Sequence, residues 1–510
     1  MEETMIVAAL SIVVLIASLK LLLPWGKSFR KQFPPSPPSL PFVGHLFYLK
    51  KPLHRTFREL SDKYGPVFSL RVGNRRIVIV SSPSLVQECF GPNDKILANR
   101  PQFLNTKYVA YDSTTIGTAP YGPHLRNLRR IAAVEMVSSH RLNLFLSVRA
   151  DEVRRMVVKL AREAREGPVA VDLRQAITVV VMNNIMRMIA GKRYYDDDQG
   201  KEESSRRFHA IMQEVLDKSG LGNPADYFPI LKWISPKYVK RVKELGFRMN
   251  EFTQGLVDEM RSKKVKSDTM LDRLLVLQEK EPMQYTDEVI KGLIQSMMLA
   301  GTDTSIATLS WAMANLLNHP HVMEKARREI DDGVGQDRVM EESDLPKLPY
   351  LNNIVSETFR FNPPGPFLLP HYSSTDCTIG GYHVPRGTIV QVNTWAIHHD
   401  PTVWPDPDTF RPERFEGESK DTDTDTDTDT YRLISFGIGR RACPGGALGL
   451  KIVGLTLGTF IQCFEWNTVG GAAVDMSEGM GPITHMAGPL VAMCKARDVA
   501  TKLLEQEDSS

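Results

Sequence analysis

Cysteine is scarce in this chain and shows no sign of a disulfide or zinc framework. The 510 residues contain five cysteines, Cys89, Cys377, Cys443, Cys463 and Cys494, which are far apart and include no C-x-x-C pair. Disulfide scaffolds and zinc knuckles need paired cysteines at short, regular spacing. The sequence therefore argues against both classes, and its cysteine usage fits a reducing, cytosol-facing environment.

Excess charge of one sign is also missing. The chain has 63 Lys and Arg against 60 Asp and Glu, a net charge of +3. It contains no long basic stripe with interleaved aromatic residues, so nothing favours nucleic-acid binding. No Pro/Gly/Ser-rich linker divides the chain after its N-terminus, and no repeat recurs at solenoid spacing. Length alone allows roughly two to four domains, but we expect one large domain.

The N-terminus has the character of a membrane anchor. Residues 5–23 are apolar apart from two serines and Lys20, which is near the length that spans a bilayer. Two glutamates precede this segment and basic residues follow it, which is the reverse of the charge order in a cleaved signal peptide. We predict an uncleaved anchor over residues 1–25 and a basic, proline-rich hinge over 26–41. The remaining residues, 42–510, then face the cytosol.

Residues 421–430 are five consecutive Asp-Thr dipeptides. The tract is acidic and has no apolar face, so it cannot contribute to a core. A cation or partner site is the functional alternative, but a repeating acidic tract implies no fixed set of ligands. We interpret it as a solvated loop whose role the sequence leaves open.

Hydrophobic periodicity predicts a mainly α fold with a minor β part near each end. Long stretches repeat apolar residues at helical spacing, while a few short segments alternate or are continuously apolar. The predicted helices cover residues 57–64, 140–165, 172–190, 205–218, 236–263 and 287–318, and the predicted strands cover 67–72, 76–80, 378–379, 383–384 and 389–392.

The most informative segment is the glycine-rich, basic loop of residues 436–445, which contains Cys443. Its glycines allow tight turns and close approach to a flat partner. A cysteine thiolate can ligate haem iron, and a helix beginning just after Cys443 would offer backbone N–H groups to the sulfur. Arg441 could then face a haem propionate. An ordinary buried cysteine after a loop is the alternative, but this spacing of Phe, Gly, Arg and Cys disfavours it.

The loop matches the pattern F-x-x-G-x-R-x-C-x-G and so resembles the haem-binding signature of the cytochrome P450 superfamily. The fixed positions are filled by Phe436, Gly439, Arg441, Cys443 and Gly445. The resemblance implies the cytochrome P450 fold and a haem b cofactor whose iron is axially ligated by Cys443. It also implies that Phe436, Gly437 and Arg441 contribute to cofactor binding.

A second motif lies inside the long apolar helix predicted for residues 287–318. The run 300–305 combines a glycine with hydroxyl residues and an acid, which predicts a local helix opening because hydroxyls compete for backbone carbonyls. A kink packed in the core is the alternative. The run fills the superfamily pattern [AG]-G-x-[DE]-T-[TS]. The resemblance implies that Thr304 hydrogen-bonds dioxygen and that Asp303 relays protons, which makes these two the candidate catalytic residues.

Basic residues are expected to contact the haem propionates. Residues 121–130 resemble the superfamily's W-R-x-x-R helix, with Arg129 at the second arginine. Leu125 stands where the family usually has tryptophan, so one propionate hydrogen bond is missing and we expect weaker haem retention. His371 matches a position that is often Arg or His and that reaches a propionate, although a lone histidine is more often just a hydrogen-bonded loop residue.

Two further segments resemble structural motifs of the superfamily. Glu357 and Arg360 lie three residues apart on a predicted helix and can pair, although an E-x-x-R match alone is weak. Residues 410–415, with the run P-E-R-F, resemble the family's meander. By this resemblance Arg414 completes a Glu–Arg–Arg cluster that locks the region behind the Cys443 loop.

Several segments resemble in sequence a plant clan of the superfamily, the one that contains isoflavone hydroxylases, lignan methylenedioxy-bridge enzymes and xanthone-forming oxidases. They are residues 98–101, 126–131 and 462–466. This similarity suggests a phenolic or other aromatic substrate. The segments expected to face it are 103–118, 299–300, 367–369 and 483–485.

We therefore expect a monooxygenase of the endoplasmic reticulum membrane that uses O2 and electrons from an NADPH-cytochrome P450 reductase. It would hydroxylate or oxidatively couple a small aromatic metabolite, and the sequence does not choose between these reactions. The alternatives are a hydroxylase of terpenoids or xenobiotics, an isomerase or dehydratase on the same fold, or a haem-binding protein without turnover. The intact pair Asp303 and Thr304 disfavours an isomerase, which needs no protons for O2.

Overall fold

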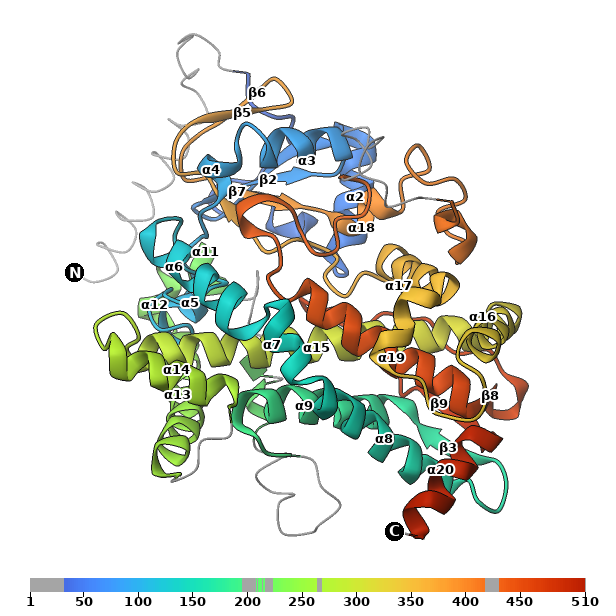
Figure 1. The fold of residues 1–510 in the computed structure, drawn as a ribbon. Coiled ribbons are helices and arrows are strands. Elements are labelled where there is room, and N and C mark those ends of the chain that lie inside the picture. The colour runs from blue at the N-terminus through green and yellow to red at the C-terminus, as the bar shows by residue number, and fades with distance from the viewer. Residues whose placement is uncertain are drawn as a thin grey trace, which may run out of the picture.

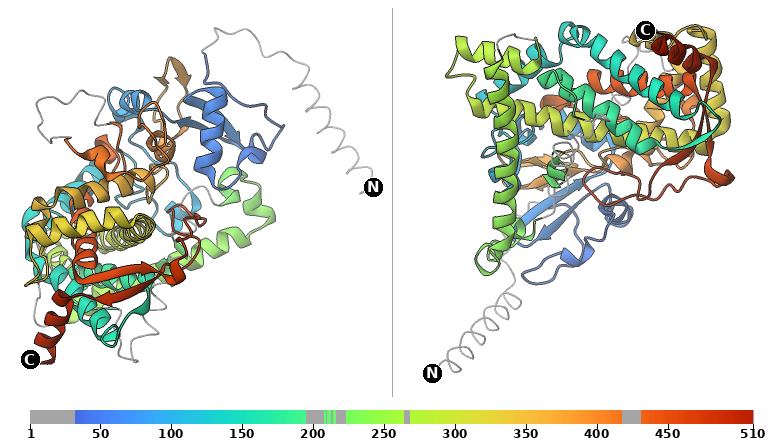
Figure 2. Two further views of the ribbon diagram at one scale, coloured as in Figure 1. Left: turned by 90° about the vertical axis from the view of Figure 1, so that its right-hand side faces the viewer. Right: turned by 90° about the horizontal axis from the view of Figure 1, so that it is seen from below.

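The computed structural model describes residues 32–194, 208, 210–212, 214–215, 223–263, 268–417 and 431–509. The described chain is mainly helical, as the periodicity predicts, and it contains three small sheets. The four-stranded sheet lies with α2 (Leu53–Tyr64) and α3 (Pro83–Phe90) in one part of the molecule, and the rest is mainly helical and contains the three-stranded sheet (Figures 1 and 2). The predicted anchor, residues 26–31 of the hinge, most of the predicted helix 205–218, and the Asp-Thr tract lie outside the described residues.

The largest sheet joins segments from the two ends of the chain. Its strand order is β1 (Val67–Val72), β2 (Arg75–Val80), β7 (Ile389–Val392), β4 (His371–Tyr372). Strands β1 and β2 form the predicted antiparallel hairpin, and its turn contains Gly73 at a φ of 55°. Strand β2 pairs with β7 in parallel, and the continuous apolar run of β2 is buried, as expected for an inner strand.

The other two sheets are smaller. Strands β5 (Cys377–Ile379) and β6 (Tyr382–Val384) form an antiparallel ribbon at the predicted positions. The third sheet has the order β3 (Val169–Asp172), β9 (Val491–Ala496), β8 (Phe464–Thr468). This sheet was not predicted, because its strands are short and are brought together only by the tertiary fold.

Helix α15 (Asp287–Asn318) is the central element of the helical part, and its bounds are those predicted. It packs against α9 (Leu173–Ala190), α17 (Pro349–Phe361) and α19 (Gly446–Cys463), among others (Figure 1). It is buried on all sides over its second half, which explains why that half has no separate polar face toward water. Because α19 begins just after Cys443, the packing of α15 on α19 brings the two predicted motifs into one region.

The remaining helices surround these elements. Their bounds are α4 Asp94–Leu97, α5 Leu104–Tyr108, α6 Pro123–Ile131, α7 Ser139–Leu144, α8 Leu146–Glu163, α11 Pro224–Tyr227, α12 Leu231–Ile234, α13 Lys237–Ser262, α14 Met270–Lys280, α16 Pro320–Gly333, α18 Thr394–His398 and α20 Asp498–Asp508. Short 3-10 turns include Pro412–Phe415 and Gly439–Arg441.

Side-chain caps explain where the long helices begin. The carboxylate of Asp172 accepts the N–H of Gln175 at the start of α9, and the hydroxyl of Thr286 accepts the N–H of Val289 at the start of α15. Such caps satisfy backbone donors that have no partner within the helix. Helix α9 ends at Gly191, which has a φ of 71°, the left-handed conformation that glycine adopts at low cost.

Among the described helices, α19 is long and apolar enough to span a membrane by length and composition. About 72% of it is buried inside the protein. It is therefore a core helix, which agrees with its packing on α15, α16 and α17.

The segment expected to face the substrate, residues 103–118, is held by a close helix contact. A Cβ atom built on Gly246 of α13 would lie 2.1 Å from the carbonyl oxygen of Tyr108, at the end of α5. That separation is far below van der Waals contact, and the neighbouring atom is backbone, which cannot rotate away. Glycine at position 246 therefore allows α13 to approach this segment.

We predict that Gly246→Ala destabilises the protein by roughly 1–3 kcal/mol, because α13 must move away from Tyr108. Gly255→Ala is the matched control on the same helix, since a Cβ at Gly255 meets nothing within 4 Å. The control should be neutral or stabilising by up to about 1 kcal/mol. Thermal unfolding midpoints of both variants measure the difference, and equal midpoints would show that the contact is not tight.

Candidate functional site

The Cys443 loop is a tightly closed turn. The backbone N–H of Cys443 donates to the carbonyl of Phe436 at 2.7 Å. Gly437 and Gly439 have φ values of 66° and 71°, in the left-handed region that favours glycine. A Cβ on Gly439 would also lie 2.8 Å from a carboxylate oxygen of Asp94. Gly439 is thus required by both the turn and its packing, whereas Gly437 is required by the turn.

Cys443 lies just before the N-terminus of α19 and is exposed as a residue, although neighbouring groups surround much of its thiol. Burial of the group against its neighbours raises the pKa of the thiol, whereas the N–H groups of Gly445 and Gly446 and the guanidinium of Arg129 lower it. Burial outweighs the donors, so the pKa remains above its ordinary value. The expected stabilisation of an anionic sulfur is therefore partial, and a bound metal cation would complete it, because metal coordination deprotonates a thiol.

A pair of aromatic rings packs against the Cys443 loop. The ring of Phe436 meets the ring of Phe359 edge-on, with 5.0 Å between the centroids. A Cβ on Gly446 would lie 3.4 Å from the Phe436 ring. The first residue of α19 therefore packs directly on Phe436, and this contact sets the start of the helix relative to the sulfur.

Three arginines gather beside the loop, and all of them donate to backbone carbonyls. Arg441 donates to Ala98 at 2.6 Å, to Ile116 at 3.2 Å and to Ala119. Arg129 donates to Ala442 at 2.9 Å. Arg100 was not predicted as a site residue, and it donates to Gly117, Leu369 and Pro370 at 2.9–3.2 Å.

This arginine cluster carries unbalanced positive charge. Burial, and then repulsion from Arg441 and Arg129, lower the pKa of Arg100. Burial and Arg129 lower the pKa of Arg441 to about 10. Within the part of the chain that the structure describes, none of the three forms an ion pair with a carboxylate, whereas the adjacent Arg440 pairs with Asp94 at 2.7 Å.

The donor set fits haem. A cysteine at a helix N-terminus suits the iron, and a largely shielded cationic cluster that has no carboxylate partner among the described residues suits the two propionates. The sequence signal for Arg100 was the run Ala98-Asn99-Arg100-Pro101, which pointed only to a family likeness. Its role beside Arg441 became visible once the chain was folded.

His371 lies next to the arginine cluster at the start of β4. Its Nδ1 atom is 2.9 Å from the carbonyl oxygen of Leu97, so Nδ1 donates. Burial, and then the charge of Arg100, lower the pKa of His371 well below its usual range. In this neutral form Nε2 is an acceptor, so the predicted propionate contact requires His371 to take up a proton, which a nearby anion would favour.

Leu125 is fully buried in the main hydrophobic core. Its aliphatic side chain cannot donate a hydrogen bond to a propionate. The weaker haem retention expected from Leu125 stays a prediction.

Helix α15 runs through the Thr304 motif without interruption, so the predicted local opening is not present. The hydroxyls instead donate within the helix to the carbonyl four residues earlier: Thr304 to Ala300 at 2.6 Å and Ser305 to Gly301 at 3.0 Å. Thr304 is half-buried, and its neighbour Asp303 is buried at 7% exposure. A hydrogen bond of this kind leaves the Thr304 oxygen free to accept a second one.

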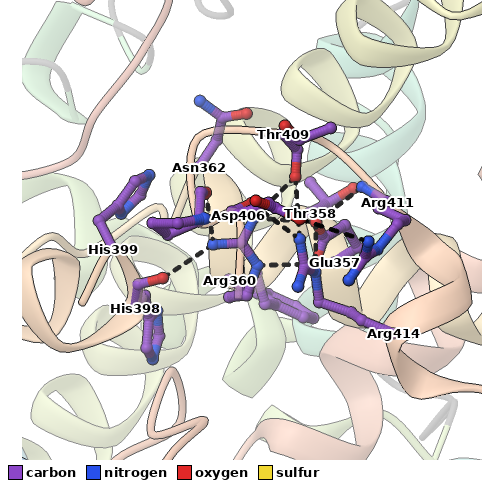
Figure 3. Close-up of polar contacts among 12 residues, drawn as sticks. Glu357, Thr358, Arg360, Asn362, His398, His399, Asp406, Thr409, Arg411 and Arg414 are labelled. Atoms are coloured by element: carbon purple, nitrogen blue, oxygen red, sulfur yellow. Dashed lines mark hydrogen bonds and ion pairs between the residues drawn. The ribbon is translucent and has the colours of Figure 1, made fainter. Parts of the chain in front are cut away.

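The predicted Glu–Arg–Arg cluster is present (Figure 3). Arg360 donates to both carboxylate oxygens of Glu357, at 2.7 and 2.8 Å, and both side chains are fully buried. Arg414 donates to the same carboxylate at 3.1 Å, as does the backbone N–H of Arg411 at 2.9 Å. The cluster ties α17 to the meander, as the sequence motifs indicated.

His398 connects this cluster to the Cys443 loop. Its carbonyl accepts from Arg360 at 2.8 Å, and its Nε2 accepts the backbone N–H of Ile434 at 3.2 Å. Burial lowers the pKa of His398 well below its usual range, so the ring is neutral and can accept. Beside it, the Ser435 hydroxyl donates to the carbonyl of Phe359 at 3.2 Å. The loop is therefore anchored to α17 just before Phe436.

Comparison with known proteins agrees with this geometry. The cytochrome P450 family model matches residues 34–489. The chain is 49% identical to cytochrome P450 81F1 of Arabidopsis thaliana over 97% of its own length and 99% of that protein. It is 48% identical to isoflavone 3'-hydroxylase of Medicago truncatula, over 95% of this chain and 97% of that one.

Solved structures agree with the sequence relatives. A zebrafish cytochrome P450 solved with progesterone superposes with a TM-score of 0.72 at 27% identity, over 88% of this chain and 100% of that chain. The chain therefore belongs to the cytochrome P450 family. It is a monooxygenase that carries a cysteine-ligated haem b.

The buried carboxylate of Glu357 generates a stability prediction. Glu357→Gln leaves Arg360 with an uncompensated buried charge, which should cost about 3–5 kcal/mol. We expect a lower thermal midpoint and a lower haem content. Glu507→Gln is the control, because it breaks the exposed Arg154–Glu507 pair, which should contribute less than about 1 kcal/mol. Similar midpoints for both variants would refute the anchoring role of Glu357.

Proposed function

We propose that Cys443 is the axial iron ligand and that Arg100, Arg129 and Arg441 hold the haem propionates. When bound, haem supplies the activation of dioxygen and the insertion of one oxygen atom into a substrate. The observation that carries the proposal is the position of Cys443 just before the N-terminus of α19, beside arginines that form no ion pair with a carboxylate among the described residues. Phe436 and Gly437 shape the loop around the sulfur. His371 lies next to the arginine cluster, and its ring is proposed to contact a propionate.

Thr304 and Asp303 are proposed to deliver protons during turnover. Thr304 lies on α15, which packs against the helix that begins after Cys443. Its hydroxyl is anchored on the Ala300 carbonyl, so the oxygen is held in one place and can accept a hydrogen bond on its other side. Asp303 is an acid adjacent in sequence, suited to pass protons inward through ordered water.

The substrate is proposed to be a phenolic or other aromatic plant metabolite. Support comes from the named relatives, which include the isoflavone 3'-hydroxylase of Medicago truncatula and an isoflavone 2'-hydroxylase of Glycyrrhiza echinata at 47% identity. Ring hydroxylation is the reaction that these names favour. Oxidative phenol coupling uses the same oxidant and differs in how the substrate lies.

The membrane and redox setting follows from the sequence. The apolar segment of residues 5–23 with basic residues after it supports a single-pass anchor in the endoplasmic reticulum, with the catalytic domain facing the cytosol. An NADPH-cytochrome P450 reductase would then supply electrons one at a time on that side.

The test is a product screen in microsomes that contain the full chain and a plant reductase, supplied with isoflavones and other phenols. We expect an oxygenated product that requires both NADPH and O2. Thr304→Ala should keep the haem spectrum and substrate binding but lower product per NADPH by at least about tenfold, with the electrons diverted to hydrogen peroxide.

Two results would overturn parts of this proposal. Wild-type product yield per NADPH in Thr304→Ala would remove the proton-delivery role of Thr304. Turnover of terpenoids but of no aromatic compound in the panel would remove the proposed substrate class and leave the haem chemistry intact.

A further inference from the structure

A histidine outside the haem-binding residues contacts the proposed proton-delivering acid. The Nε2 atom of His485 lies 3.0 Å from Oδ2 of Asp303. The two side chains are 19% and 9% exposed, so the hydrogen bond is largely shielded from water. Within the described residues, His485 is the side chain that pairs with the Asp303 carboxylate. From its sequence, His485 was expected only to face the substrate.

The backbone before His485 is fixed to the core. The N–H of Thr484 donates to the carbonyl of Pro364 at 2.8 Å, and the indole N–H of Trp311 donates to the carbonyl of Thr484 at 2.7 Å. Trp311 is fully buried and lies on α15, two turns beyond Asp303. The helix that carries the acid therefore also holds the turn that carries the histidine.

The backbone after His485 is held as well. The N–H of Gly479 donates to the carbonyl of His485 at 2.7 Å, and the N–H of Ala487 donates to the carbonyl of Ser477 at 2.8 Å. These bonds surround an antiparallel bridge between Glu478 and Met486. His485 is thus presented to Asp303 from a turn that is anchored on both sides.

We propose that His485 is a positioning residue that holds the Asp303 carboxylate in the orientation from which it delivers protons. A carboxylate on a short side chain can rotate between several staggered conformations. A fixed donor on Oδ2 selects one of them and leaves Oδ1 available for water. Loss of the donor lets Asp303 rotate, so protons arrive later and more electrons are lost to hydrogen peroxide. This inference rests on the proposed role of Asp303.

The test compares His485→Ala with His485→Gln in the full-length holoenzyme with its reductase. Glutamine places an N–H donor close to the position of Nε2, so it should restore most of the function. His485→Ala should lower product per NADPH by roughly tenfold and change the solvent isotope effect on product formation, at unchanged haem content. If His485→Ala loses haem, His485→Leu, which fills the space without a donor, replaces it.

His383→Ala is the matched control. His383 faces Asp376 at 3.5 Å in the β5–β6 ribbon, away from Asp303, so its loss should leave product per NADPH and the isotope effect unchanged. Equal yields from His485→Ala and wild type would overturn the inference, as would equal losses in His485→Ala and His485→Gln.

Asp303→Asn separates this inference from the function on which it rests. If Asp303→Asn keeps the wild-type yield of product per NADPH, the proton-delivery role of Asp303 is wrong. If Asp303→Asn loses yield but His485→Ala does not, only the positioning role of His485 is wrong. Because His485 acts through Asp303, the double variant should lose no more than Asp303→Asn alone, and additive losses would contradict the inference.

Discussion

The position of the Cys443 loop depends on the ion pairs of one buried carboxylate, that of Glu357. It lies fully buried and receives both Arg360 and Arg414, and a buried charge is tolerated only when its hydrogen bonds are complete. The remaining donors of Arg360 reach the carbonyls of His398 and Pro407. The hydrogen bonds of the Glu357 carboxylate thus fix the meander. They also hold His398, whose imidazole accepts the N–H of Ile434 and fixes the backbone that leads to Phe436.

The arginines near Cys443 differ in their partners from those of the Glu357 cluster. Behind the loop, the Glu357 carboxylate pairs with both Arg360 and Arg414. Beside the loop, the partners of Arg100, Arg129 and Arg441 within the described residues are backbone carbonyls. Burying such a group of cations is unfavourable without an anion, so the fold alone does not explain them. Two propionates would offset two of these three positive charges. The same chain therefore builds one arginine cluster around a carboxylate of its own and a second one that suits the anionic groups of a cofactor.

Local spacing accounts for what could be predicted. The hairpin at Gly73 and helix α15 follow from short-range patterns, and the Cys443 loop follows from a motif in which Gly437 and Gly439 adopt the left-handed conformation. Other features depend on residues far apart in the chain. The β3–β9–β8 sheet, Arg100 beside Arg441, and His485 beside Asp303 arise only when distant segments meet. The predicted helix opening at Thr304 is not present, because the hydroxyls of Thr304 and Ser305 donate to carbonyls of their own helix without breaking it.

The central claim is that Cys443 binds haem iron as a thiolate. The most direct measurement is the carbon monoxide difference spectrum of the reduced full-length protein. Wild type and Cys377→Ser, a variant at a half-buried cysteine in the β5–β6 ribbon, should both show the thiolate-type Soret band. Cys443→Ser should abolish that band together with all turnover. An unchanged band in Cys443→Ser would contradict the account.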